Sequence, residues 1–377
     1  MTRRRALVWL AAAVAVSAAL YLAIRQTRDL TDFEVYRTAG ARVLEATPLY
    51  RPEDGHFVFK YLPAFAYAMV PFAIVGPEVA RAAWFALSVA CLVFFVAGSM
   101  RALPDRRRAM TPVLAWTIVV MARCDIRELS LGQTNALLGA LLVAALLAVT
   151  RGSGRSAGAL VGLATFVKPY TVLLAPWLAA TVGLAALVAS GLVVLFGLAL
   201  PAASYGWVGN LDLLGAWFRT VTETTAPNLM LPENISFLSA WAKWIGPGPV
   251  ATAAAAATTV GALAVVGMAL LRRGPVRHPA YAEFALVLLL IPVLTPQGWD
   301  YMLLLATPAV ICLVDRWGAL PASWKVATTA ALAAVALPMR EIFGLAVTRE
   351  VMGTGVLTLA ALVLVAGLMR LRLHGAA

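Results

Sequence analysis

Asp32 is the residue in this chain best placed to act as a general base. It follows an apolar stretch over residues 6–24 and a polar stretch that begins at Arg25. Residues 3–5 are all arginine, so this end is expected to stay in the cytoplasm and Asp32 to emerge on the opposite side of the membrane. A carboxylate at such an interface can take a proton from a bound hydroxyl group.

Asp32 also has a purely structural interpretation. Thr31 and Glu34 have the spacing of a capping box, in which two side chains satisfy backbone N–H groups at the start of a helix. Asp32 would then be an acidic residue in the first turn of a short helix, where it interacts favourably with the helix dipole. Position alone favours this structural role over catalysis.

The composition is that of an integral membrane protein. Hydrophobic residues make up 62% of the 377 residues and charged residues 13%, and the mean hydropathy is +0.86. A soluble domain does not need so much apolar material. The net charge of +12 comes from arginines in short loops, as the positive-inside rule expects, so we predict a lipid bilayer as partner and no nucleic acid. The three cysteines and three histidines have no metal-binding spacing, and we expect neither a metal nor a cofactor.

Many further apolar stretches follow the first one. They cover residues 62–76, 79–100, 109–122, 129–149, 156–167, 170–182, 184–204, 249–271, 280–296, 299–314, 322–338 and 351–369. Several are shorter than the roughly 20 residues of a straight span, so we expect broken, tilted or re-entrant segments. We predict an all-α polytopic protein with about 11–13 membrane segments in a single domain over residues 1–377. The absence of a clear internal repeat counts against an inverted-repeat transporter.

Basic segments assign the sides of the membrane. Residues 151–155, 272–278, 316 and 370–374 are predicted to be cytoplasmic. The first outer loop (25–61), a large outer loop (205–247) and residues 297–300 and 339–350 then lie outside. Between residues 61 and 128 the number of crossings must be even, yet three apolar stretches lie there. One of them is therefore not a simple crossing, and the sequence leaves open which one.

Polar residues that could bind a substrate or take part in a reaction gather on this predicted outer face. Lysine and arginine can hold a phosphate, and tyrosine and tryptophan offer flat faces to a sugar. Ionisable groups in such places are rare and usually functional, although each one alone could snorkel to water or pair with a neighbour. The candidate substrate-binding residues are Tyr36, Arg37, Tyr50, Lys60, Tyr61, Arg127, Gln133, Asn135, Lys168, Asn234, Trp299 and Asp300.

The chain lacks a Gly-rich phosphate loop and a paired acidic metal motif. A sugar donor anchored in the bilayer through a phosphate therefore fits these residues better than a nucleotide sugar bound through a metal.

Several motifs resemble glycosyltransferase family 87, whose members use polyprenyl-phosphate sugars. Residues 32–40 (Asp-Phe-Glu-Val-Tyr-Arg-Thr-Ala-Gly), 48–50 and 59–63 resemble the start of that family. Gly132-Gln-Thr-Asn135 is similar to its Gly-Gln-x-Asn segment, and residues 158–169 resemble its Gly-rich helix that ends in Lys-Pro. The resemblance covers the N-terminal half best.

This resemblance implies the fold of the C superfamily of glycosyltransferases, with short amphipathic helices in the first outer loop. It also implies an active site on the non-cytoplasmic face of the cell membrane, with Asp32 as the catalytic aspartate and Lys168 near the donor phosphate. The second half departs more from the family. Asn234-Ile-Ser236 only loosely resembles an Asn-x-Ser loop, and in residues 296–301 Tyr301 replaces the histidine of a late Trp-Asp-His motif.

The predicted function is transfer of a sugar from a polyprenyl-phosphate donor to a lipid-linked or polysaccharide acceptor. Mannose is the first choice for this sugar. The reaction would be an inverting displacement with Asp32 as base. One alternative is a polytopic transporter or lipid flippase of the cell envelope, which predicts charges near the bilayer midplane and pseudo-symmetric halves. Another is a non-catalytic membrane partner, which the replacement of the late histidine by Tyr301 leaves open.

Overall fold

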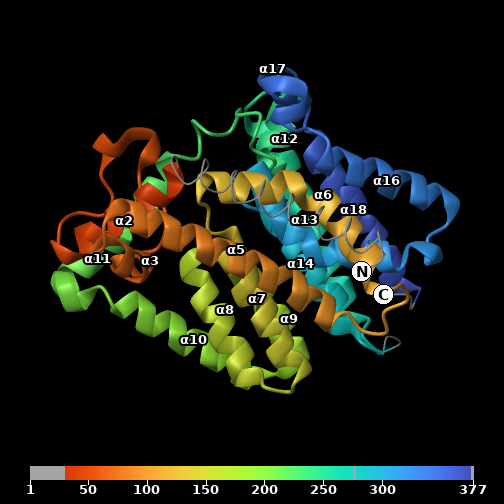
Figure 1. Cartoon of the computed structure of the whole chain (residues 1–377), viewed down its shortest axis with the longest axis horizontal. Helices are drawn as coiled ribbons and strands as arrows, with labels where there is room; N and C mark the ends of the chain where they lie inside the picture. Colours follow the sequence, from red (N-terminus) through yellow and green to blue (C-terminus); the bar gives the residue numbers. More distant parts are fainter. Residues whose placement is uncertain (1–29, 275–276, 375–377) are drawn as a thin grey trace, which may run out of the picture.

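The computed structural model describes residues 30–274 and 277–374, and this part of the chain is built from helices (Figure 1). It contains no named strand; one isolated antiparallel bridge joins Asn234 to Trp299. The predicted all-α class is confirmed. The apolar stretch over residues 6–24 lies outside the described residues, as does its side of the membrane.

The helices of the first half begin with short elements and continue with longer ones. They are α2 (Thr31–Leu44), η2 (Pro52–Phe57), α3 (Pro63–Ala68), α4 (Val70–Ala73), α5 (Pro77–Ala102), α6 (Met110–Leu131), α7 (Asn135–Thr150), α8 (Gly154–Val167), η3 (Pro169–Leu174), α9 (Ala175–Val182), α10 (Leu184–Ala199) and α11 (Ala202–Glu223).

The second half alternates long helices with short 3-10 segments. They are α12 (Phe237–Ile245), α13 (Pro249–Leu271), α14 (Pro279–Leu294), η4 (Asp300–Ala306), α15 (Thr307–Asp315), η5 (Trp317–Ala319), α16 (Ala322–Ala336), α17 (Arg340–Gly353) and α18 (Val356–Leu373).

Long apolar helices give the described chain its membrane character. By length and composition α5, α13 and α18 can each cross a membrane. Two further pairs, α6 with α7 and α10 with α11, pass the same test together but bend by 118° and 92° at their breaks. Shorter apolar helices, α8 and α14 among them, complete the set. The polytopic class and the predicted broken segments are confirmed, while the total of 11–13 segments stays a prediction.

The apolar stretch over residues 62–76 is the one that does not cross. It forms α3 and α4, which are only six and four residues long and therefore far too short to span a bilayer at 1.5 Å per residue. Both pack against α2, and a Cβ on Gly40 of α2 would lie 2.7 Å from the backbone of Met69. Of the two other apolar stretches, α5 can cross a membrane alone, whereas α6 passes the same test only together with α7.

The most buried part of the fold is formed by α14, η4 and α15. All residues from Tyr281 to Val293 are buried, and so are all residues of η4 and α15. A helix that is apolar all round belongs in a protein interior. In Figure 1 α14 runs through the middle of the molecule, and α13, α18, η4 and α15 pack against it. This core carries the Trp299-Asp-Tyr301 segment at its edge.

The Gly-rich helix α8 packs closely on α10. A Cβ on Gly158 would lie 1.9 Å from the carbonyl oxygen of Ala186, so no side chain fits there. Pro169 begins the next segment and fits the end of α8, because the residue before a proline disfavours helical geometry. This packing holds Lys168 at the turn after α8.

Candidate active site

Asp32 lies in the first turn of α2 and is half-buried. The capping box predicted around it is not present. Leu30 occupies the N-cap position without a side-chain cap, and its carbonyl accepts a hydrogen bond from the Glu34 N–H at 3.1 Å. The Glu34 carboxylate instead pairs with Arg37 and Arg81, each at 2.8 Å. Asp32 is thus an acidic residue in the first turn of a helix, as the structural interpretation expected. Its side chain is half-buried and not fully exposed to water.

The turn between α6 and α7 brings Gln133 to Asp32. Gly132 ends α6 with a φ of +70°, and a Cβ at this position would lie 2.9 Å from Cβ of Phe33. Glycine therefore allows the end of α6 to approach α2. The side-chain amide of Gln133 donates a hydrogen bond to the Asp32 carboxylate, and its Oε1 accepts one from the Tyr36 hydroxyl at 3.2 Å.

The surroundings of Asp32 change its basicity. Burial raises the pKa of the Asp32 carboxyl above its usual value because the charged form loses water. The hydrogen bond from Gln133 opposes this rise, and so do the positive charges of Lys168, His56 and Arg127. Asp32 is therefore a stronger base than an exposed aspartate, and it is surrounded by groups that favour its ionised form.

Two tyrosines extend the polar cluster from Asp32. The hydroxyls of Tyr36 and Tyr61 lie 2.9 Å apart, and the Tyr61 hydroxyl lies 3.1 Å from Oγ1 of Thr134. Tyr50 supports this arrangement from behind, since its hydroxyl donates to the backbone carbonyl of Tyr61 at 2.6 Å. The Tyr61 ring also stacks on Phe65, with centroids 4.8 Å apart. The aromatic packing holds both hydroxyls close to Asp32.

Two of the four lysines of the chain lie at this cluster. The Nζ of Lys168 is 5.7 Å from the centroid of the Tyr61 ring, and that of Lys60 donates to Oε1 of Gln297 at 3.4 Å. Burial lowers the pKa of Lys60, and the charge of Asp32 opposes this shift. Among the described residues no carboxylate forms an ion pair with either lysine. Both lysines are within electrostatic reach of Asp32, and Lys168 is also within reach of Glu128.

The late Trp-Asp-Tyr segment borders the same cluster. Tyr301 is close enough to Asp32 and Tyr61 for electrostatic interaction. Asp300 forms a buried ion pair with Arg123, whose Nε donates to the Val335 carbonyl at 2.8 Å.

Comparison with protein families gives one match, and it covers part of the segments that build this cluster. The model of glycosyltransferase family 87 matches residues 59–296, well over half of the chain. The chain belongs to glycosyltransferase family 87. It is accordingly a membrane glycosyltransferase, which confirms the predicted enzyme class and family. The match includes Lys60, Gln133 and Lys168 but begins after Asp32 and ends before Trp299. None of the curated proteins compared with the chain matches it.

Three predicted site residues of this glycosyltransferase are engaged in contacts with other parts of the protein. Arg37 pairs with Glu34. The Asn135 amide donates to the Glu128 carboxylate at 2.7 Å, at the start of α7. The Asn234 amide donates to the carbonyls of Asn228 and Pro296, at 3.1 and 3.2 Å.

Asn234 and its neighbours hold the late segment in place. The Ile235 N–H donates to the Gly298 carbonyl at 2.6 Å, and the Asp300 N–H to the Glu233 carbonyl at 2.9 Å. Trp299 lies half-buried between these bonds. Substrate binding by Asn234 and Trp299 stays a prediction, whereas their role in positioning residues 298–300 is visible.

Two members of the cluster were not among the predicted site residues. Thr134 lies inside the Gly-Gln-x-Asn motif, and its hydroxyl contacts Tyr61. Gln297 precedes Trp299 and is held by the hydroxyls of Thr224 and Thr225, at 3.0 and 3.1 Å. Both lie inside segments that resemble motifs of the family, and that position was the available signal. Their hydrogen-bond partners come from distant segments and were not visible in the sequence.

Proposed function

We propose that this glycosyltransferase moves a sugar, mannose as the first choice, from a polyprenyl-phosphate donor to a lipid-linked or polysaccharide acceptor. The site would open to the non-cytoplasmic face of the cell membrane. One observation carries the proposal: Asp32, hydrogen-bonded by Gln133, shares a half-buried cluster with Lys60 and Lys168, which have no carboxylate partner among the described residues. Such a cluster offers both a base and a phosphate site.

The proposed reaction is a single displacement. Asp32 takes the proton from an acceptor hydroxyl, and the acceptor oxygen forms a bond to the anomeric carbon of the sugar. The bond between that carbon and the phosphate oxygen breaks at the same time, so the configuration inverts and polyprenyl phosphate leaves with the electron pair. Lys168 and Lys60 stabilise the charge that develops on the phosphate.

The order of residues in the cluster supports this division of roles. Tyr61 lies between the two sides: its hydroxyl contacts Tyr36, which bonds to the amide that holds Asp32, and its ring lies under the Lys168 ammonium. A sugar placed over this ring would have the base on one side and the cation on the other. Aromatic faces are suited to the apolar faces of sugars.

The outward orientation can be tested with topology reporters. A reporter that functions only in the periplasm should give signal when fused after residue 50 or after residue 225, and none when fused after Arg273. The expectation follows from the arginines between residues 272 and 278, which should stay cytoplasmic. Signal from the Arg273 fusion together with silence at residue 50 would reverse the orientation and remove the outer-face mechanism.

The activity itself is tested with purified full-length protein in nanodiscs. The protein is incubated with labelled polyprenyl-phosphate mannose and a membrane glycolipid extract, and wild-type protein should produce labelled glycolipid. Asp32→Asn should abolish the product, whereas Glu45→Gln, a change to an exposed carboxylate at the other end of the same helix, should not. Product from a polyprenyl-phosphate pentose alone would reject mannose. Product from a nucleotide sugar alone would reject the lipid-phosphate donor.

A further inference from the structure

The hydrogen bonds beside Asp32 form a chain whose direction follows from counting protons. The ionised Asp32 carboxylate can only accept hydrogen bonds, so the amide nitrogen of Gln133 faces it and Oε1 of Gln133 is left for Tyr36. The Tyr36 hydroxyl has one proton, and it donates this proton to Oε1 at 3.2 Å. Its 2.9 Å contact with the Tyr61 hydroxyl therefore needs Tyr61 as the donor.

The chain continues by the same rule to Thr134. The Tyr61 proton is used toward Tyr36, so the Thr134 hydroxyl donates across its 3.1 Å contact with Tyr61. Thr134 occupies the N-cap position of α7, where a threonine hydroxyl usually accepts a backbone hydrogen bond. In the described chain it forms no such cap, and the Ala136 N–H donates instead to the Glu128 carboxylate at 2.7 Å. The Thr134 hydroxyl is thereby available to Tyr61.

The inner part of this chain is shielded from water. Thr134, Tyr36 and Gln133 are at most 5% exposed. Burial raises the pKa of the Tyr36 and Tyr61 hydroxyls, so both keep their protons near neutral pH. A glutamine amide can present either its nitrogen or its oxygen to a neighbour. Here a reversed Gln133 would place its oxygen against the carboxylate, and the protons of the chain would have to turn with it.

We propose that Tyr36, with Tyr61 and Thr134 behind it, is a positioning residue that keeps the Gln133 amide nitrogen directed at Asp32. This assignment rests on the proposed role of Asp32 as the base. It also changes the role expected for Tyr36. Because the single proton of its hydroxyl is committed to Gln133, Tyr36 does not donate to a sugar and acts on the base instead.

Other groups set the charge around Asp32. The charged and titratable side chains that face it from other segments are His56, Lys60, Tyr61, Arg127, Lys168 and Tyr301. All of them are kept when the Tyr36 hydroxyl is removed. Tyr36→Phe also keeps the ring, whose centroid lies 5.7 Å from that of Phe65 and 6.0 Å from that of Trp84. A change in the ionisation of Asp32 in this variant therefore reports the lost hydrogen bond.

The test measures the pKa of Asp32 in full-length protein in nanodiscs. Infrared difference spectra against Asp32→Asn, recorded in each background, isolate this carboxyl group and need no turnover. Tyr36→Phe should raise the pKa by up to about one unit, the scale of one net hydrogen bond. The acidic limb of kcat/KM should move to higher pH by the same amount, while the KM for the donor hardly changes.

Tyr281→Phe is the matched control. It removes another buried hydroxyl, which donates to the Pro308 carbonyl at the same distance of 3.2 Å. The pKa of Asp32 and the acidic limb should stay at their wild-type positions. Tyr61→Phe acts one step further along the chain and should raise the pKa of Asp32 by less than Tyr36→Phe.

A double variant separates positioning from packing. If Tyr36 acts through Gln133, then Tyr36→Phe combined with Gln133→Leu should raise the pKa no further than Gln133→Leu alone. Additive shifts would overturn the proposal, and so would a raised KM with an unmoved acidic limb.

The positioning role and the catalytic role fail separately. Near-normal sugar transfer by Asp32→Asn would remove Asp32 as the base, and the infrared titration would still decide whether Tyr36 orients Gln133. Loss of transfer in Asp32→Asn together with an unshifted titration in Tyr36→Phe would keep the base and overturn the positioning role.

Discussion

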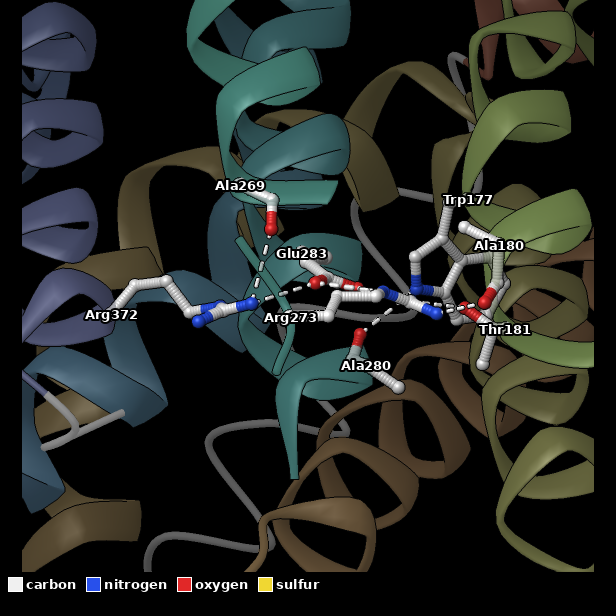
Figure 2. A network of polar contacts seen from close by, with 8 residues as sticks. All are labelled: Trp177, Ala180, Thr181, Ala269, Arg273, Ala280, Glu283 and Arg372. Atoms are coloured by element: carbon white, nitrogen blue, oxygen red, sulfur yellow. Dashed lines mark hydrogen bonds and ion pairs between the residues drawn. The ribbon is translucent and has the colours of Figure 1, made fainter. Parts of the chain in front are cut away.

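The carboxylates of Glu283 and Asp32 are both withdrawn from water, but their surroundings differ. Glu283 is fully buried and lies between two guanidinium groups (Figure 2). Arg273 Nε donates to both of its oxygens at 3.0 Å, and Arg372 donates to Oε1 at 3.0 Å. The same arginines reach backbone carbonyls, Arg273 that of Ala180 and Arg372 that of Ala269. These contacts join α9, α13, α14 and α18.

Asp32 has no such enclosure. Its carboxylate accepts a hydrogen bond from the neutral amide of Gln133, and the lysines act on it from a distance. A buried carboxylate paired with two arginines is already complete, so a ligand has nothing to add there. A carboxylate with free cations nearby keeps its capacity for a substrate. The difference in pairing thus separates a structural charge cluster from a reactive one.

The largest expected effect concerns the structural cluster. Glu283→Gln leaves two arginines without a counter-charge in the protein interior. Removing one partner of a buried ion pair typically costs about 3–5 kcal/mol, so the free energy of unfolding in detergent should fall by about that amount. The exposed Glu45→Gln variant serves as control. An unchanged unfolding transition would mean that water already solvates the two guanidinium groups.

Asp32→Asn should show the reverse pattern. Turnover should fall by about two orders of magnitude or more, the usual scale of a general base. The unfolding transition should not fall and should rise slightly at neutral pH, because burial raises the pKa of Asp32 and its ionised form therefore costs stability. Turnover and unfolding are measured on the same preparation. Near-normal sugar transfer would shift the role of base to Asp125, which lies in α6, or to Asp300.

Lys168 provides a smaller test of the reactive cluster. Lys168→Ala should raise the KM for the donor roughly tenfold or more, since a hydrogen bond to a charged group contributes about 1.5–3 kcal/mol. Lys168→Arg keeps the charge and should retain part of the donor affinity. Donor titrations at fixed acceptor give both values. If the alanine variant binds donor as wild type does, Lys168 is only a lysine that snorkels from a helix end.

The smallest effect is a shift in pH dependence. The acidic limb of kcat/KM should lie above 3.8, the ordinary pKa of an aspartate, because burial raises the pKa of Asp32. Gln133 stabilises the ionised carboxylate, so Gln133→Leu should raise this pKa further and move the limb to higher pH. Activity is then lost earlier as the pH falls. A limb that stays in place, or moves to lower pH, would contradict the role of this hydrogen bond.

The class of the protein and many of its elements follow from local patterns in the sequence. Apolar composition and the length of apolar stretches are local properties, and the stretch over residues 249–271 coincides with α13. The Gly-rich segment before Lys168 was likewise predicted to be a helix that ends at Lys-Pro, and α8 ends at Val167. Asp32, Gln133 and Lys168 were named from motifs, and the structure brings them into one cluster.

The pairing of the charged side chains depends instead on helices that are far apart in the sequence. Gln133 reaches Asp32 across 101 positions of the sequence, and Arg372 reaches Glu283 across 89. The spacing of Thr31 and Glu34 predicted a capping box, yet Glu34 pairs with Arg81 from another helix. Local patterns could not foresee these contacts, because a charged side chain binds whichever partner the packing of distant helices brings within reach.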